Sequence, residues 1–427
     1  MRARRGRRRP AAALAAVLAI GLAVTGCSAE TTVTVDVPAQ VQGDLPEATV
    51  QQLQDAVTSA MTASGSSGAI VGVWAPWSGQ WVSGLGTQTP GGADPVDAEA
   101  TFRAGRVTRA MTCDALYAVA AEGKLALTDE VSDWVSGVPD LTDVTLGSLC
   151  DSTSGIGSYA PQLSSLWLGN PTRVWNPHEL ASYGLGQRAL GTPGSGYFDS
   201  DAGYVLLGLA LERATGESAA TVLQQYVFDP LALDSTQLPS GEAAAPSTGG
   251  PVLSGYQSFR DGNGVMNCAA PTDYTVMSAS SGYTDSGVVS DITDLGRYAQ
   301  ALASGALLSD GQDRFANPLP AYSGAPSWFT ARGGAYQAGS MVGQYGAFPG
   351  YLTAAFSDAT SGLTVAVVLN NSAADTGVVA GLAWELAAIA SKVPAAGGGA
   401  TPDAGLPWTA QQFHDAIIAA SICPPAQ

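Results

Sequence analysis

The chain has 427 residues, 46% of them hydrophobic, a length that suits one large domain or two smaller ones. Acidic residues outnumber basic residues by 36 to 18, which gives a formal net charge of −18. This acidic balance argues against nucleic acid and against an anionic lipid surface as electrostatic partners.

The first 26 residues predict an export signal that is not part of the fold. The cationic stretch MRARRGRRRP precedes the apolar run AAALAAVLAIGLAV, which is too short for a stable membrane span. The run ends in VTGC, which resembles a bacterial lipobox, so Cys27 is expected to carry acyl chains at the extracytoplasmic face of the cell membrane. An ordinary signal peptide with a chance cysteine is the alternative, and the arginine pairs leave Sec and twin-arginine export open.

Residues 27–47 are predicted to form a flexible spacer, because SAETTVTVDVPAQVQGDLP is polar and lacks the spacing of a helix. The signal holds six of the 18 basic residues and no acidic residue, so 12 basic and 36 acidic residues remain after it. Such a charge fits a soluble domain that is tethered near an envelope.

Hydrophobic spacing predicts the elements that follow. Apolar residues at helical spacing predict helices, and several of these segments end at a glycine, which is typical of a helix C-terminus. The predicted helices cover residues 47–63, 108–123, 127–135, 142–156, 201–216, 290–305 and 374–393. Short apolar runs predict strands over residues 68–76, 79–88, 334–345, 350–358 and 363–371. A glycine-rich linker at 394–405 and a last helix within 407–425 complete the chain.

The order of these elements predicts an α+β fold. Strands near both ends of the chain, with helices between them, favour one antiparallel sheet that both chain ends close. The helical middle is then expected to form a separate all-helical lobe beside the sheet. We assign residues 48–393 to this domain and residues 394–427 to a linker and C-terminal helix.

Four cysteines besides Cys27 predict two disulfides in an exported protein, with three pairings open. We favour Cys113–Cys150 and Cys268–Cys423. The alternative is that one or more of these cysteines are buried thiols.

Several segments resemble those of one enzyme superfamily, in the same order along the chain. They are FRAGRVTRAM and its continuation to 135, TLGSLCDSTSGI at 145–156, PGSGYFDSDAGYVLLGLALERATG at 193–216, the stretch 286–309 and GQYGAFPGY at 343–351. These resemble motif regions of the serine β-lactamase and penicillin-binding protein superfamily, on its class C β-lactamase and D-alanyl-D-alanine carboxypeptidase branch. The resemblance implies a β-lactamase-like fold over most of residues 48–392.

The positions that carry chemistry in that superfamily differ here. Its Ser-x-x-Lys motif places a nucleophile and a base on one helical face, but the matching positions hold Arg106 and Arg109. Arginine has no nucleophilic oxygen and stays protonated. The Tyr-x-Asn positions hold Asp199 and Asp201, and the His-x-Gly or Lys-Thr-Gly positions run from Gln344 to Gly346.

No other residues offer an obvious replacement for the lost groups. The chain has two lysines, Lys124 and Lys392, and neither follows a serine by three positions. Its two histidines are His178, at an expected helix start, and His414, in the tail. No metal-ligand spacing and no nucleotide fingerprint occurs, so we expect neither a metal nor a cofactor.

The changed positions are matched in charge. The resemblance implies that the first and second motifs face each other across a cleft, so we expect Arg106 and Arg109 to pair with Asp199 and Asp201. An unpaired charge in a closed site is strongly unfavourable, which would demand such a match. The favoured interpretation is that structural ion pairs fill an inactive pocket. The alternative is a ligand site in which one arginine is free to bind a carboxylate.

Three functions remain open from the sequence. We favour a catalytically inactive binding or scaffold protein at the cell envelope, with a peptidoglycan-like ligand or another envelope protein as its partner. A divergent active hydrolase of the β-lactamase, D-alanyl-D-alanine carboxypeptidase or esterase type is the enzyme alternative, and a purely structural lipoprotein is the third.

Overall fold

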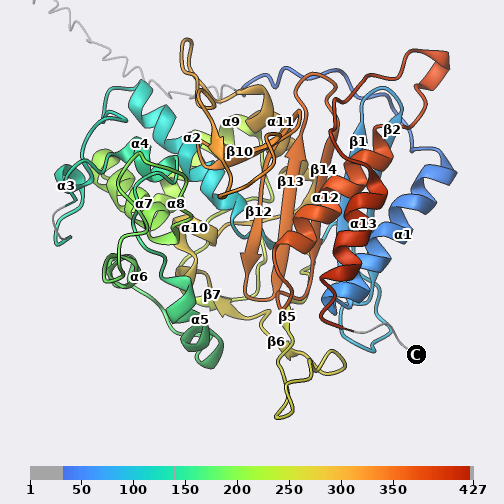
Figure 1. Ribbon diagram of the computed structural model, residues 1–427, viewed down its shortest axis with the longest axis horizontal. Helices are drawn as coiled ribbons and strands as arrows, with labels where there is room; N and C mark the ends of the chain where they lie inside the picture. Colours follow the sequence, from blue (N-terminus) through green and yellow to red (C-terminus); the bar gives the residue numbers. More distant parts are fainter. Residues whose placement is uncertain (1–31, 139–140, 424–427) are drawn as a thin grey trace, which may run out of the picture. The chain divides into compact units, whose positions relative to one another are not determined.

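An eight-stranded antiparallel sheet forms the centre of the protein in the computed structural model, which describes residues 32–138 and 141–423. The part of the chain from Thr32 onward is one compact unit. Across the sheet the strands are β2 (Gly79–Gly86), β1 (Gly68–Ala75), β14 (Thr364–Leu369), β13 (Tyr351–Ser357), β12 (Met341–Phe348), β11 (Ala335–Ala338), β10 (Phe329–Arg332) and β9 (Leu319–Pro320). The expected α+β class is confirmed (Figure 1).

Strands from the N-terminal and C-terminal parts of the chain join in one antiparallel sheet, as predicted. The N-terminal hairpin joins the C-terminal strands where β1 pairs with β14, with Ile70 opposite Val368 and Val71 opposite Val367. Both strands are buried along their whole length, so they read as continuous apolar runs rather than alternating ones. Three two-residue ladders lie outside the sheet: β3 (Phe102–Arg103) with β8 (Val289–Ser290), β4 (Ala243–Ala244) with β7 (Met277–Ser278), and β5 (Tyr256–Gln257) with β6 (Thr272–Asp273).

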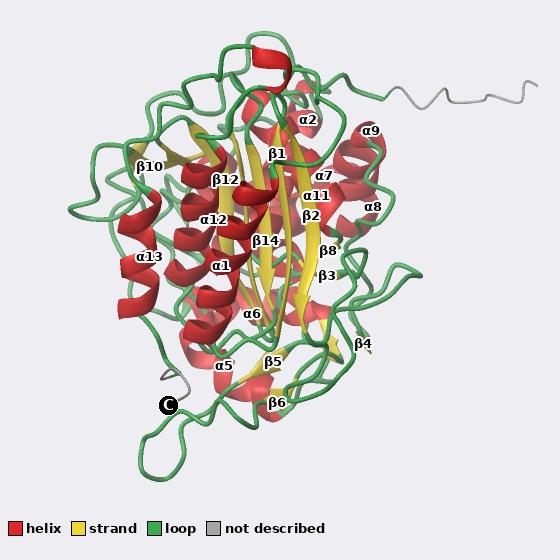
Figure 2. Ribbon diagram, turned by 90° about the vertical axis from the view of Figure 1, so that its right-hand side faces the viewer, coloured by secondary structure: helices red, strands yellow, loops and turns green. Residues whose placement is uncertain are grey.

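Helices cover both faces of the sheet (Figure 2). One face packs against α1 (Glu47–Ser64) and α12 (Gly377–Ala390), and α13 (Ala410–Ala419) packs against these two helices. The other face packs against α2 (Val107–Ala121) and α11 (Ile292–Ser304), which continue into the helical lobe. The lobe and its connections contain α3 (Val131–Trp134), α4 (Leu146–Cys150), α5 (Ala160–Gly169), α6 (Pro177–Leu185), α7 (Asp201–Thr215), α8 (Ala219–Leu223), α9 (Asp229–Leu231) and α10 (Tyr283–Ser286).

The strongly periodic helices were predicted to within a few residues. Helix α7 ends at Gly216 and α11 at Gly305, and both glycines have positive φ, which relieves the strain that a side chain would suffer there. Asp291 caps α11 by accepting a hydrogen bond from the backbone N–H of Asp294. Helix α5 and the edge strands β9 and β10 were not predicted, since short segments offer little periodicity to detect.

Both predicted disulfides are present. Cys113 on α2 is bonded to Cys150 at the end of α4, with 5.6 Å between their Cα atoms. Cys268, in the loop between β5 and β6, is bonded to Cys423 after α13, with 6.0 Å between their Cα atoms. The first bond ties α2 to the helical lobe, and the second closes the tail onto the domain.

The N-terminal segment corrects the prediction of a flexible spacer over residues 27–47. From Val33 to Leu45 it makes backbone hydrogen bonds with the domain, from Val33 N–H to the Pro230 carbonyl (2.8 Å), from Val41 N–H to the Pro76 carbonyl (2.9 Å) and from Leu45 N–H to the Gln80 carbonyl (3.0 Å). Residues 27–31, with the expected lipidation at Cys27, and the signal at 1–26 lie outside the described residues.

The C-terminal tail is a packed part of the same unit. Trp408 and Phe413 join an aromatic cluster with Trp328 and Trp384, and the Phe413 and Trp384 ring centroids lie 5.1 Å apart. The Trp408 indole N–H donates to the Trp384 carbonyl (2.9 Å). Within residues 32–138 and 141–423, the helices are all too short or too polar to cross a bilayer.

Candidate active site

Arg106 and Arg109 stand at the start of α2, where the chain leaves β3. Gly105 between them and the strand has φ +55°, and a Cβ there would lie 3.1 Å from the carbonyl carbon of Ala347 on β12. Arg106 occupies the N-cap position and Arg109 lies in the first turn, with no acidic residue in that turn. A helix N-terminus disfavours cations, so these arginines need carboxylates from elsewhere in the fold.

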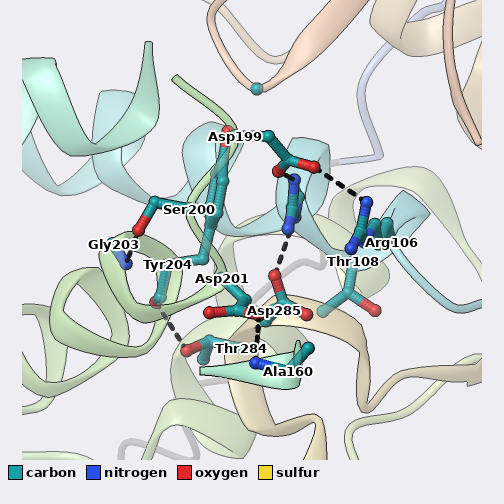
Figure 3. Close-up of polar contacts among 12 residues, drawn as sticks. Arg106, Thr108, Ala160, Asp199, Ser200, Asp201, Gly203, Tyr204, Thr284 and Asp285 are labelled. Atoms are coloured by element: carbon teal, nitrogen blue, oxygen red, sulfur yellow. Dashed lines mark hydrogen bonds and ion pairs between the residues drawn. The ribbon is translucent and has the colours of Figure 1, made fainter. Parts of the chain in front are cut away.

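Two aspartates supply that charge. Asp199 bridges both arginines, with Oδ2 at 2.9 Å from Arg106 Nη1 and Oδ1 at 2.5 Å from Arg109 Nη1. Asp285, on α10, accepts a hydrogen bond from Arg109 Nε at 2.7 Å (Figure 3). Three segments that are distant in the sequence therefore converge on one ion-pair cluster, which we define as Arg106, Arg109, Asp199 and Asp285.

The cluster is closed at one end and open at the other. The side chains of Arg109 and Asp285 are 1% and 6% exposed, whereas those of Arg106 and Asp199 are 27% and 40% exposed. The guanidinium of Arg109 also lies 4.7 Å from the centre of the Tyr204 ring, a cation–π contact. The buried half is thus held from several sides, and only the outer half meets solvent.

Burial and charge act in opposite directions on the titration of the cluster. Burial raises the pKa of the Asp199 carboxyl, but Arg106 and Arg109 outweigh burial and hold that pKa well below its usual range. Burial lowers the pKa of Arg109, and Asp199 and Asp285 more than reverse this. Asp199 and Arg109 are therefore charged at neutral pH, and Arg109 cannot accept a proton from a nucleophile.

Asp201 does not join the cluster, so this part of the predicted pairing is wrong. It accepts hydrogen bonds from the Ser158 hydroxyl (2.6 Å) and from the backbone N–H groups of Tyr159 (2.6 Å) and Ala160 (2.9 Å). These N–H groups open α5, so Asp201 satisfies a helix N-terminus that the sequence did not reveal. Burial and the nearby Asp285 raise the pKa of Asp201.

The third motif, at Gln344 to Gly346, leaves room for Arg106 and supplies no reactive group. Gln344 is 2% exposed; its amide nitrogen donates to the Gly334 carbonyl (2.8 Å), and its amide oxygen accepts from the Tyr345 N–H (2.8 Å). A Cβ at Gly346 would lie 2.6 Å from the side chain of Arg106, so glycine leaves room for that arginine. Gly346 therefore borders the cluster, and Gln344 does not reach it.

The hydroxyl groups beside the cluster are engaged in local hydrogen bonds. Thr108 donates to the Gly105 carbonyl (2.7 Å) and accepts from the Val288 N–H (3.2 Å). Ser152 shares a hydrogen bond with the Tyr204 hydroxyl (2.9 Å). Within the described part of the chain, Arg109 Nη2 and the Tyr159 hydroxyl are the buried polar atoms near the cluster that lack a hydrogen-bond partner.

The histidines and lysines that the sequence analysis considered as replacements lie away from the cluster. His414 lies in the tail and contacts Glu385 (3.0 Å), and His178 lies at the start of α6, as the sequence predicted. Lys124 pairs with Glu122 just beyond the end of α2, and no described ion pair involves Lys392. No cluster of histidine, cysteine, aspartate and glutamate suited to a metal occurs among the described residues.

A family model, a curated relative and several solved structures match the chain. The family model described as Beta-lactamase matches residues 53–388. Penicillin-binding protein 4* of Bacillus subtilis (strain 168) is 25% identical over 144 residues, which is 34% of this chain and 32% of that protein. The match therefore spans about a third of the curated relative's length.

Solved structures share the fold. A D-stereospecific amidohydrolase from Streptomyces sp. has a TM-score of 0.67 and 22% sequence identity, over 79% of this chain and 98% of its own. An octameric penicillin-binding protein homologue from Pyrococcus abyssi has a TM-score of 0.62 and 20% identity, over 78% of this chain and 75% of its own. At these identities the likeness shows the fold alone.

Proposed function

The chain belongs to the Beta-lactamase family, and we propose that it is a catalytically inactive member that acts as a binding or scaffold protein at the cell envelope. One observation carries this proposal: the positions for the nucleophile and its base hold arginines that are fixed by Asp199 and Asp285. The cluster fills the place where a serine would attack, and its carboxylates are bonded to the arginines rather than to a nucleophile.

The hydroxyl groups beside the cluster also support a catalytically inactive site, because they already form local hydrogen bonds. A nucleophile needs a base within hydrogen-bond reach, but Thr108 is bonded to backbone groups and Ser152 to Tyr204. Both neighbours of the Thr108 hydroxyl are backbone atoms that cannot accept a proton at neutral pH. Activation would therefore require breaking the local hydrogen bonds first.

The contacts within the cluster favour ion pairs that fill the pocket over an open ligand site. Asp199 already occupies one nitrogen of each arginine and Asp285 a second nitrogen of Arg109, so a ligand carboxylate would compete with two carboxylates that are in place. We therefore place the binding role on other surfaces of the domain, with peptidoglycan-like ligands or an envelope protein as the partner class. The lipid anchor at Cys27 would hold those surfaces at the extracytoplasmic face of the membrane.

Turnover and binding assays on the mature chain separate this proposal from its enzyme alternative. With a chromogenic β-lactam, a D-alanyl-D-alanine peptide and an aryl ester we expect no hydrolysis above the buffer rate. Titration with soluble peptidoglycan fragments should give saturable heat that Arg106→Ala leaves unchanged, because the ligand does not enter the cluster. Hydrolysis abolished by replacing one hydroxyl residue, with Thr108→Ala and Ser152→Ala as the first variants, would establish the divergent hydrolase instead.

A further inference from the structure

The bound N-terminal segment fixes where a lipid anchor would leave the domain. The segment, residues 32–45, runs along one end of the molecule, from α9 to the turn between β1 and β2 (Figure 1). Its first bond joins the Val33 N–H to the Pro230 carbonyl (2.8 Å), and Gln80 N–H donates to the Gly43 carbonyl (3.0 Å) at its other end. The chain is therefore attached to the fold from its thirty-third residue.

Side-chain packing holds the same segment in place. Val33, Val35 and Val37 are half-buried, whereas Thr34 and Asp36 between them are exposed. This period of two is that of an extended strand with one face against the protein. Val35 packs against the core that lies under α2 and α11, and Leu45 is buried against the opposite sheet face. The segment thus bridges both layers of the fold.

The remaining length of chain before Val33 is short. Five residues lie between Cys27 and Val33, and the six Cα-to-Cα steps of an extended chain span at most about 20 Å. A spacer that stayed free up to Pro46 would instead span about 65 Å and would allow any orientation of the domain. The bound segment removes most of that freedom.

We propose that the end of the domain that carries α9 and Pro230 faces the lipid bilayer in the anchored protein. This inference rests on the envelope-anchor part of the proposed function and assigns it a surface. The occupant is a membrane surface that is held by the acyl chains of Cys27. Exposed Asp36, Asp229 and Asp234 lie on or beside this end, so an anionic headgroup layer would not attract it, and the anchor alone keeps it close.

The orientation directs the other end of the molecule away from the membrane. The loop between β5 and β6, which contains Val265, lies at the opposite end in both views (Figures 1 and 2). Lys124, just past the C-terminus of α2, donates to Tyr226, four residues before Pro230. The ion-pair cluster, at the other end of the 15-residue helix, is then at most about 22 Å farther from the bilayer than Lys124.

Fluorescence quenching in vesicles tests this orientation. The lipidated chain is placed on phosphatidylcholine–phosphatidylglycerol vesicles whose headgroups carry a nitroxide, with a fluorophore on either Asp234→Cys or Val265→Cys, both exposed positions. We expect the label at 234 to be quenched at least threefold more than the label at 265. Equal quenching at the two positions would overturn the proposal.

Two control variants show whether the bound segment causes the difference. Val35→Asp with Val37→Asp should release the segment, and a 15-residue glycine–serine insert between Thr31 and Thr32 should lengthen the tether without touching the bound residues. In both, the protein should still float with the vesicles while the quenching ratio falls toward one. A ratio unchanged by the insert would contradict the role of the segment, even if the double variant failed to fold.

The anchor and the absence of catalysis are tested separately from the orientation. Mass spectrometry of the N-terminal peptide should show an acylated Cys27, and Cys27→Ala should leave the protein in the soluble fraction. An unmodified Cys27 would overturn the membrane-facing surface and leave the inactive site intact. Hydrolytic turnover would overturn the inactive site and leave the quenching result intact.

Discussion

Two arginine–aspartate groups share helix α2, and they differ in how completely their polar atoms are satisfied. Asp114 forms an ion pair with Arg314, whose Nε donates to the Gly333 carbonyl (2.6 Å) and whose Nη2 donates to the Ala110 carbonyl (2.7 Å). The Tyr298 hydroxyl donates to the other Asp114 oxygen (2.7 Å). Everything in this group is buried and bonded.

In the ion-pair cluster, whose arginines lie one to two turns earlier along α2, fewer polar atoms are hydrogen-bonded. Asp199 and Arg106 reach solvent, and the buried Nη2 of Arg109 has no partner among the described residues. A structural link between α2 and the β10–β11 turn requires a buried ion pair whose polar atoms are all hydrogen-bonded. The partly open cluster fits our proposal that matched charges fill the positions of the family's nucleophile and base.

Breaking the complete group should have the largest effect. Arg314→Met leaves the Asp114 carboxylate buried and without its cation, which should lower the free energy of unfolding by about 3–5 kcal/mol. Urea unfolding of the mature chain measures this loss. Asp114→Leu combined with Arg314→Met should recover a large part of it, and additive losses would contradict the pairing.

Breaking the buried half of the cluster, Arg109 with Asp285, should have the second-largest effect on stability. Arg109→Met leaves Asp285, which is 6% exposed, without a cation, and we expect a loss of about 2–4 kcal/mol. Adding Asp285→Asn should restore at least about 1 kcal/mol, whereas adding Asp201→Asn should have no such effect, since Asp201 bonds to α5. Urea midpoints of the two double variants provide the comparison, and equal midpoints would refute the distinction.

Asp199 should give a pH-dependent contribution. Because the two arginines hold its pKa below the unfolded value, its stabilisation is complete above about pH 5 and is lost as pH falls through the folded pKa. The difference in unfolding free energy between the wild type and Asp199→Asn should therefore be constant from pH 5 to 7 and shrink below about pH 4. A difference that grew on acidification would contradict the sign of the shift.

The exposed half should have the smallest effect. Arg106→Ala removes a partly exposed ion pair, which should change the free energy of unfolding by less than about 1 kcal/mol. The change should also shrink in 0.5 M salt, where surface charges are screened. A loss as large as that of Arg109→Met would mean that the two arginines are equally structural.

The sequence predicted the parts of this picture that depend on long regular elements. The main helices and one antiparallel sheet closed by both chain ends followed from periodicity and chain order. The cysteine count predicted two disulfides and left three pairings open, of which the favoured one is present. The pairing of Asp199 with Arg106 and Arg109 followed from the resemblance, which placed two motifs across one cleft. These inferences succeeded because each used a pattern that extends over many residues.

Single side-chain partners could not be predicted in the same way. Asp201 was paired with an arginine because α5, whose N-terminus it satisfies, was not recognised. Asp285 was missed because it lies in a four-residue helix, just before the segment that resembles the family. The spacer was misjudged because its polar composition obscured the alternation of Val33, Val35 and Val37, which was the visible sign of a bound strand.

Intact-mass analysis after exposure to acylating probes tests the central claim most directly. The mature chain is incubated with a fluorescent penicillin and, separately, with a phosphonate ester, and its mass is compared with that of the untreated protein. If arginines fill the nucleophile and base positions, the mass is unchanged by either probe. A stoichiometric adduct that maps to one serine or threonine would show that acyl transfer persists.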